Sequence, residues 1–297
     1  MKISVGPILY YWPKQQVLDF YQRLLESSVD IIYLGEAVCS KRHELRIEDW
    51  IELAVKLNES GKQVVLSTLA LIEARSELSG LQKICSNNDG ILVEANDMAA
   101  VQMLSEQGLP FVSGSSINIY NAHTLKILQQ QGMQRWVMPV ELNRETLNDI
   151  LAEAKTMGFS DEIETEVFAY GKLPLAYSAR CFTARMKNLP KDDCRYSCID
   201  YPDGVVMETQ EDQELFTLNG IQTQSGYCYN LLPQLPEMIN LGVDVVRISP
   251  QFEGTEQVVQ QFRNGLDQGK VDAGLIARQH CNGYWFGQSG MSTVQDR

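Results

Sequence analysis

Short apolar runs alternate with amphipathic segments along most of this chain. In the amphipathic segments apolar residues recur every three or four positions, as Val17, Phe20, Tyr21 and Leu24 do, which is typical of a helix with one buried face. Between them, short runs rich in Val, Ile and aromatic residues predict buried strands. These runs lie at residues 3–9, 30–35, 63–68, 90–94, 111–113, 135–139, 163–168 and 244–249.

Helical patterns separate the predicted strands. They lie at residues 17–25, 50–57, 70–81, 98–106, 123–131, 145–157, 232–241 and 255–264. Strands that alternate with helices pair in parallel through right-handed crossovers. The alternation therefore predicts an α/β protein built as a (β/α)8 TIM-like barrel. A doubly wound open sheet is the alternative, but the chain contains no G-x-G-x-x-G sequence to support it.

The alternation stops after the seventh predicted strand. The segment at about 170–240 contains a cysteine-bearing stretch, a short apolar run at 214–218 and a predicted loop at 219–230. We interpret it as a long insertion into the barrel, which resumes with the eighth strand. The predicted organisation is a barrel over residues 1–268, including this insertion, and a C-terminal tail over 269–297 that is partly loose.

Charge and composition narrow the class of protein. The net charge is −13 and no run of Lys or Arg exceeds two residues, which argues against a nucleic-acid partner. Lys41, Arg42 and Arg46 form the local basic group, which we interpret as solvated helix charges. The N-terminus lacks the features of a secretory signal, and no apolar run is long enough to span a membrane. These features predict a cytoplasmic protein without a transmembrane segment.

Seven cysteines in a reducing compartment are expected to be metal ligands, catalytic thiols or core residues rather than disulfides. Three of them, Cys181, Cys194 and Cys198, fall in the insertion, and the last two lie in the polar stretch KDDCRYSC. A polar loop is a poor place for apolar core residues. Thiolates bind zinc and iron–sulfur clusters, each of which takes about four protein or solvent donors. One donor is missing from this stretch.

The barrel topology suggests the fourth donor. Loops that follow the strands of such a barrel share one end, where active sites lie. Cys39 follows the strand at 30–35 and is therefore the first candidate, whereas Cys85 precedes a strand and is expected at the opposite end. Cys228 and Cys281 remain alternatives. Spacing does not decide between zinc and an iron–sulfur cluster, because only Cys194 and Cys198 show a zinc-like spacing and the ferredoxin spacings are absent.

Other catalytic chemistry has weak support. The three histidines, His43, His123 and His280, are interpreted as ordinary polar or capping residues, so a Ser-His-Asp or Cys-His arrangement is not indicated. Three glutamates, Glu36, Glu94 and Glu141, follow or end predicted strands on the functional side. Their expected roles are acid–base catalysis or hydrogen bonding to neighbouring groups. No catalytic residue can be named from the sequence.

Two motifs resemble a known family. The sequence Glu166-x-Phe168-x-Tyr170-Gly171, followed by residues 175–181, resembles the collagenase-like peptidase family, and residues 33–42 and 218–223 resemble its UbiV branch. The resemblance implies a [4Fe–4S] cluster bound by Cys39, Cys181, Cys194 and Cys198. It also implies a heterodimer with a UbiU-type sister protein that hydroxylates quinone precursors without dioxygen in anaerobic ubiquinone biosynthesis. A lipid-binding accessory protein would deliver the precursor.

One position departs from the peptidase members of that family. They carry a histidine before the glycine of the motif Glu166-x-Phe168-x-Tyr170-Gly171, whereas this chain has Tyr170 before Gly171. The difference argues against proteolysis by this chain, whose role would be that of a required subunit. A collagenase-like peptidase and a non-catalytic scaffold held together by zinc remain the alternatives.

Overall fold

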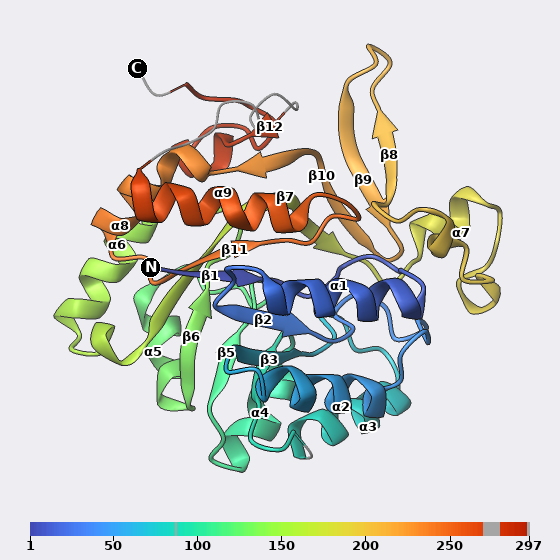
Figure 1. Ribbon diagram of the computed structural model, residues 1–297, viewed down its shortest axis with the longest axis horizontal. Coiled ribbons are helices and arrows are strands. Elements are labelled where there is room, and N and C mark those ends of the chain that lie inside the picture. The colour runs from blue at the N-terminus through green and yellow to red at the C-terminus, as the bar shows by residue number, and fades with distance from the viewer. Residues whose placement is uncertain (87, 270–279, 296–297) are drawn as a thin grey trace.

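Eight parallel strands close into a barrel in the computed structural model, which describes residues 1–86, 88–269 and 280–295 (Figure 1). Strands β1 to β7 pair in chain order, and β11 pairs with both β7 and β1 to complete the ring. The predicted TIM-like barrel is confirmed. Its strands are β1 (Lys2–Val5), β2 (Ile31–Leu34), β3 (Gln63–Ser67), β4 (Leu92–Ala95), β5 (Phe111–Ser113), β6 (Met133–Val137), β7 (Glu164–Tyr177) and β11 (Val245–Ile248).

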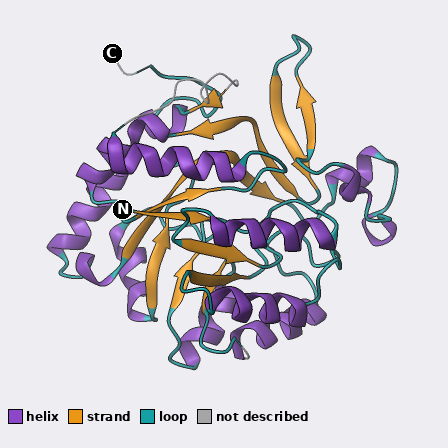
Figure 2. Cartoon of the chain, in the orientation of Figure 1, coloured by secondary structure: helices purple, strands orange, loops and turns teal. Residues whose placement is uncertain are grey.

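Helices cover the outside of the barrel (Figure 2). Helix α1 buries the apolar face that the sequence predicted, formed by Val17, Phe20, Tyr21 and Leu24. The covering helices are α1 (Lys14–Glu26), α2 (Ile47–Asn58), α3 (Arg75–Ser86), α4 (Met98–Glu106), α5 (Ala122–Gln130), α6 (Arg144–Thr156), α8 (Leu235–Leu241) and α9 (Thr255–Gln268). Helix α3 begins five residues later than predicted, because the amide of Ala70 bonds to the carbonyl of Ala37 in the loop that precedes it.

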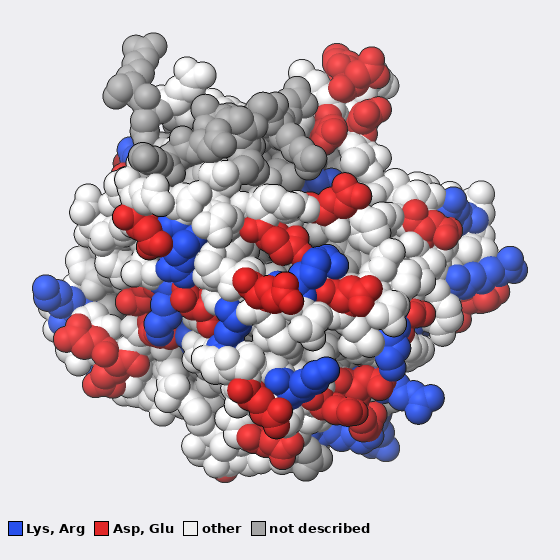
Figure 3. All heavy atoms as spheres, viewed as in Figure 1, with Lys and Arg blue, Asp and Glu red and all other residues white. Residues whose placement is uncertain are grey.

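The insertion consists of short helices and an extension of the sheet. Strand β7 continues beyond the barrel and pairs antiparallel with β10 (Gln222–Asn230), which pairs in turn with β9 (Glu214–Asn219) and then β8 (Val205–Glu208). The β8–β9 hairpin projects from the body, and carboxylates gather at its tip (Figures 1 and 3). Between β7 and β8 lie α7 (Phe182–Met186) and the 3-10 turns η2 (Lys191–Asp193) and η3 (Ser197–Asp200).

Strand β10 contradicts the predicted loop at 219–230. Its sequence, QTQSGYCYN, lacks the alternation of apolar and polar residues that marks a strand. The inward positions are instead filled by polar side chains, among them Gln222, Gln224 and Asn230, which are all buried. The prediction failed because polar side chains, rather than apolar ones, occupy this part of the interior.

Part of the C-terminal segment packs on this extension. Strand β12 (His280–Cys281) pairs with β10, and the turn η6 (Gly283–Phe286) buries Trp285, whose indole donates to Glu237. Residues 270–279, 296 and 297 of the predicted tail lie outside the described residues.

None of the helices described in the structure is both long enough and apolar enough to cross a bilayer.

A glycine fixes the loop that leaves β2. Gly35 has a φ of +127°, and a Cβ placed on it would lie 2.5 Å from the carbonyl oxygen of Ser67. We expect Gly35→Ala to lower the free energy of unfolding by about 2–4 kcal/mol, because it adds backbone strain and a steric clash. Gly61→Ala is the matched control, since Gly61 also has a positive φ, +84°, but a methyl group placed on it would have no atom within 4 Å. Urea unfolding of both variants measures the difference, and equal losses would show that the close approach does not matter.

Candidate metal centre

The loop after β2 is shaped by the carboxylate of Glu36. This side chain accepts hydrogen bonds from the amides of Val38 (2.9 Å) and Cys39 (3.0 Å) and lies 3.5 Å from Arg42. Burial raises the pKa of Glu36, although Arg42 and the two amides act in the opposite direction. Because the accepting oxygen is occupied by the loop itself, Glu36 acts as the support for Cys39 rather than as a free acid or base.

Arg42 lies at the centre of this region and is only 5% exposed. Its Nη1 donates to the carbonyl of Leu9 (2.7 Å), and its Nη2 donates to the side chain of Asn219 (2.7 Å). Its Nε has no hydrogen-bond partner among the described residues. The prediction that the basic group is solvated is therefore wrong for Arg42. A buried guanidinium needs partners, and they come from the segment after β1 and the β9–β10 turn, distant in sequence.

The β9–β10 turn also holds the loop of Cys181. The amide of Phe182 donates to the carbonyl of Gly220, and the amide of Gly220 donates to the hydroxyl of Thr183. Cys181 is the N-cap of α7, where its sulfur accepts from the amide of Ala184 at 3.4 Å. The residues that resemble a family motif at 218–223 thus position both Arg42 and Cys181.

Cys194 and Cys198 flank a tight turn. The residues between them include Arg195 and Tyr196, whose φ angles are +49° and +52°, and the amide of Ser197 bonds to the carbonyl of Cys194. Consecutive left-handed residues other than glycine are uncommon. The turn is therefore not the regular helical turn that the four-residue spacing suggests. Cys194 precedes the two left-handed residues and Cys198 follows them.

All four predicted ligands gather here. Cys181 is buried in a small apolar cluster with Leu9, Ala37, Val38, Ala184 and Ile221, and Cys39 and Cys194 pack against this cluster. The Arg42 guanidinium lies against Cys198 and lowers the pKa of its thiol, while burial and the neighbouring Cys181 raise it. The structure thus brings together thiols from the loop after β2 and from the insertion after β7.

Burial favours the neutral form of the Cys39 and Cys198 thiols. Burial raises the pKa of Cys39 to about 11, and Arg42 acts in the opposite direction. Burial also raises the pKa of Cys198. Since thiolates are the form that binds metals, a metal at this place would release protons on binding. Each of these cysteines is free of disulfides.

The gathered thiols do not form a ready site for a single metal ion in the described residues. Within the described part of the chain, no three His, Cys, Asp or Glu side chains converge closely enough to hold one metal ion. A structural zinc ion requires four ligands about 2.0–2.3 Å from a common point. In a [4Fe–4S] cluster each thiolate binds a different iron, so the sulfurs stand farther apart. The orphaned Nε of Arg42 offers a donor to sulfur at the same place.

The other cysteines lie elsewhere. Cys228 on β10 and Cys281 on β12 are on paired strands, and burial raises the pKa of Cys281 to about 12, with Cys228 adding to the effect. Cys85 is buried in the last turn of α3. The structure therefore places neither alternative, Cys228 or Cys281, within the apolar cluster around Cys181.

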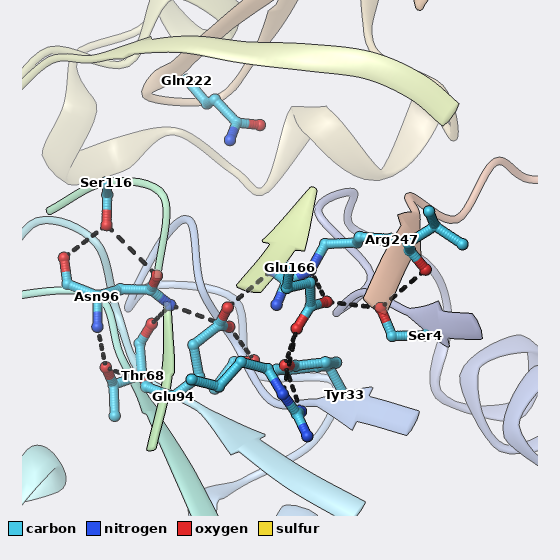
Figure 4. Close-up of polar contacts among 12 residues, drawn as sticks. Ser4, Tyr33, Thr68, Glu94, Asn96, Ser116, Glu166, Gln222 and Arg247 are labelled. Atoms are coloured by element: carbon cyan, nitrogen blue, oxygen red, sulfur yellow. Dashed lines mark hydrogen bonds and ion pairs between the residues drawn. The ribbon is translucent and has the colours of Figure 1, made fainter. Parts of the chain in front are cut away.

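A second polar group fills the barrel interior (Figure 4). Arg247 donates from Nη1 to Glu94 and from Nε to Glu166, both at 2.7 Å, and its guanidinium lies 4.1 Å above the ring of Tyr33. Tyr33 donates to the second oxygen of Glu166, and Arg135 donates to the Tyr33 hydroxyl. These side chains come from strands around the ring, so the network ties the barrel together across its interior.

This network ends at a small cavity of about 30 Å³ lined by Glu94, Asn96, Arg247 and Ser249. Among the described atoms, Nη2 of Arg247 and the Ser249 hydroxyl are buried without hydrogen-bond partners. The cavity is large enough for a water-sized group. Glu94 accepts from Ser67 as well as Arg247, which agrees with the hydrogen-bonding alternative predicted for it.

Several residues of this interior network were assigned no role from the sequence. Arg135, Glu166 and Arg247 each lie within an otherwise buried strand. A charged residue in an otherwise apolar strand indicates a buried ion pair, because a buried charge needs a partner. By contrast, Glu141 is exposed and bonds to Tyr120, while His43 and His123 are also exposed, so none of the three joins either polar group.

The fold and the grouped thiols define a (β/α)8 barrel with a cysteine site at its mouth. The sequence profile of Peptidase family U32 matches residues 17–273, and the chain belongs to that family. The predicted family resemblance is thereby confirmed, while the UbiV branch stays a prediction.

Three solved structures are similar in fold. The U32 peptidase Mk0906 is 13% identical, with a TM-score of 0.42 over 85% of this chain and 94% of that chain. A truncated 3-deoxy-D-arabino-heptulosonate 7-phosphate synthase from Thermotoga maritima is 11% identical, with a TM-score of 0.41 over 94% and 89%. Dihydropteroate synthase from Thermus thermophilus is 11% identical, with a TM-score of 0.40 over 88% and 93%.

Proposed function

We propose that this chain is the iron–sulfur subunit of an oxygen-independent hydroxylase in anaerobic ubiquinone biosynthesis. It would bind a [4Fe–4S] cluster through Cys39, Cys181, Cys194 and Cys198 and act as a heterodimer with a UbiU-type sister protein. The observation that carries the proposal is the gathering of four free cysteines from two distant loops around Arg42. A cluster bound there would supply single-electron transfer.

The surrounding residues suit such a role. Arg42 places one positive charge beside the thiols, and its ties to Leu9 and Asn219 prevent it from turning toward solvent. Positive charge favours thiolates and opposes loss of an electron from a negatively charged centre. Apolar side chains around Cys181 limit the access of water. Burial and hydrogen bonds to sulfur are the means by which a protein sets the potential of such a centre.

The peptidase alternative has less support. Tyr170 occupies the position at which the peptidase members carry a histidine, and it is buried, with its ring packed edge-to-face against Phe262. The following Gly171 has a φ of +119°, and a Cβ there would lie 2.7 Å from Cβ of Ser249. This part of the motif therefore serves close packing of β7 against β11.

Quinone synthesis without oxygen tests the proposal. In cells that lack this chain, wild-type protein should restore ubiquinone under anaerobic conditions, whereas Cys194→Ala should restore little or none, because one cluster ligand is missing. Cys194 is only partly buried, so the folded protein should persist. The measurement is ubiquinone content by mass spectrometry, with the amount of each variant and its sister protein determined in the same cells.

Cys85→Ala is the control, since Cys85 is buried away from the thiol cluster in the last turn of α3. It should restore ubiquinone as the wild type does. Full restoration by Cys194→Ala would exclude the cluster-dependent role and favour a scaffold. Hydrolysis of denatured collagen by the purified chain, retained after loss of all four cysteines, would instead favour the peptidase.

A further inference from the structure

A large cavity is lined by residues of α2 and α3 and begins beside the loop of Cys39. Its volume is about 550 Å³, within the range of sites for small organic ligands. Ser40, Lys41 and Arg42 line one end of it. Figure 1 shows α2 and α3 side by side on the outside of the barrel, with their first turns toward the end that carries α7. The cavity therefore adjoins the candidate metal centre but lies outside the thiol cluster.

The walls of the cavity are mostly apolar. Ile47, Ile51, Ile72 and Ile84 line it together with Trp50, and all five side chains remain only partly buried. The two helices touch near Gly80, where a Cβ would lie 2.9 Å from Cδ1 of Ile47. Partly buried apolar side chains that face one another across an open space gain free energy when an apolar group fills it.

The space extends along the helices. A second, shallower cavity of about 670 Å³ shares Ile47, Glu48, Ile51 and Lys83 with the first and continues along α2 to Glu59. Lys83 and Glu48 form an exposed ion pair across it at 2.8 Å. Together the two cavities form an elongated path, which suits an extended chain better than a compact ring system.

The end beside the thiol cluster is rich in hydrogen-bond donors. Lys41, Arg42, His43 and Arg46 line it. Lys41 is paired with Asp192, Arg42 donates to Leu9 and Asn219, and the carboxylates of Glu36 and Glu77 are bound as well. Glu36 accepts from backbone amides and Arg42, while Glu77 accepts from Ser40 and from the amides of Glu73 and Ala74. Burial alone would raise the pKa of Glu77, but these hydrogen bonds hold it below its ordinary value. In a chain of net charge −13, this concentration of donors favours a ligand head group that accepts hydrogen bonds.

We propose that this cavity binds an amphiphile whose extended apolar chain lies along α2 and α3 and whose hydrogen-bond-accepting head lies at Arg46, beside the loop of Cys39. The proposal rests on the cavity and holds whether or not the chain carries a cluster. Assignment of the ligand to a quinone precursor would rest on the proposed function as well.

Dodecanoate and dodecylammonium test the proposal, because they share a chain and differ in the charge of the head. Isothermal titration of the purified full-length chain below the micellar range should show saturable binding of dodecanoate, about tenfold tighter than dodecylammonium. Arg46→Glu should reduce this preference to about one, since Arg46 is exposed and its replacement should leave the fold intact. Absence of saturable dodecanoate binding, or a stronger affinity for dodecylammonium, would overturn the proposal.

A matched pair of variants locates the site. Ile84→Asp should weaken dodecanoate binding by about tenfold or more, because it places a carboxylate in the apolar wall. Leu78→Asp is the control, as Leu78 lies on the same helix, is 40% exposed and does not line the cavity. If Ile84→Asp fails to fold by circular dichroism, Ser76→Trp fills the cavity from an exposed position and should have the same effect. Unchanged binding in the folded cavity variant, or equal loss in Leu78→Asp, would contradict the assignment.

Discussion

Replacing Arg247 by methionine is expected to lower the free energy of unfolding by about 3–5 kcal/mol, because it leaves two carboxylates buried in the barrel without their shared cation. Glu94 and Glu166 both bond to Arg247 at 2.7 Å, and both are essentially inaccessible to solvent. Methionine is similar in length to the apolar stem of arginine. The change in the free energy of unfolding should therefore reflect the missing charge more than a change in packing. Urea unfolding at neutral pH measures the effect.

Arg263→Met is the control for this substitution. Arg263 pairs with Asp30 at 2.6 Å, but the pair is partly exposed, so its loss should cost less than about 1 kcal/mol. A loss in Arg247→Met no larger than that of the control would show that the interior network contributes little.

The effect of Arg247→Met should also depend on pH. Burial alone would raise the pKa of Glu166, but Arg247 and Arg135 more than offset this and hold it below its ordinary value of 4.5. A carboxylate with a lowered folded-state pKa contributes stability above the unfolded-state pKa and loses it as pH falls through the folded-state value. The difference between wild type and variant should therefore shrink below about pH 4.5.

Loss of any one of Cys39, Cys181, Cys194 and Cys198 is expected to remove most of the bound iron. Each thiolate would hold a different iron of the cluster, so no remaining thiol of the group can replace it. The measurement is iron content and visible absorption of each alanine variant after anaerobic purification. Cys281→Ala should retain both, since Cys281 lies on β12 and not in the thiol cluster.

The outcome across the five variants separates the interpretations of the site. If the alanine variants of the four gathered cysteines contain as much iron as Cys281→Ala, the gathered thiols are not ligands. Loss confined to Cys194→Ala and Cys198→Ala would leave Cys39 without the role proposed for it. The thermal unfolding of each variant must be compared, because Cys181 is buried and its replacement removes apolar contacts.

The barrel could be predicted from the sequence because its strands bury apolar residues in separated runs. The runs at 30–35 and 244–249 correspond to β2 and β11, which are buried along their whole length. The extension of β7 and strand β10 could not be predicted in this way. They are filled by polar residues such as Gln222, which is buried and donates to the hydroxyl of Tyr177, 45 residues away in sequence.

The topology of the barrel predicted that the four cysteines lie close together, but the sequence did not predict that Arg42 is buried among them. Cys39 follows β2 and the other three follow β7, and a closed parallel barrel brings such loops to one end. Arg42 stands in a locally polar sequence, SKRH, which is typical of an exposed loop. Its burial follows from Leu9 and Asn219, 33 and 177 residues away in sequence. The residues next to Arg42 in the sequence do not indicate such distant partners.

Iron and acid-labile sulfide analysis of the wild-type chain, purified without oxygen, tests the central claim most directly. A [4Fe–4S] cluster bound by the four gathered cysteines would give about four irons and four sulfides per chain and a broad absorption at about 400 nm. Stoichiometric zinc without sulfide in the same preparation would contradict the claim.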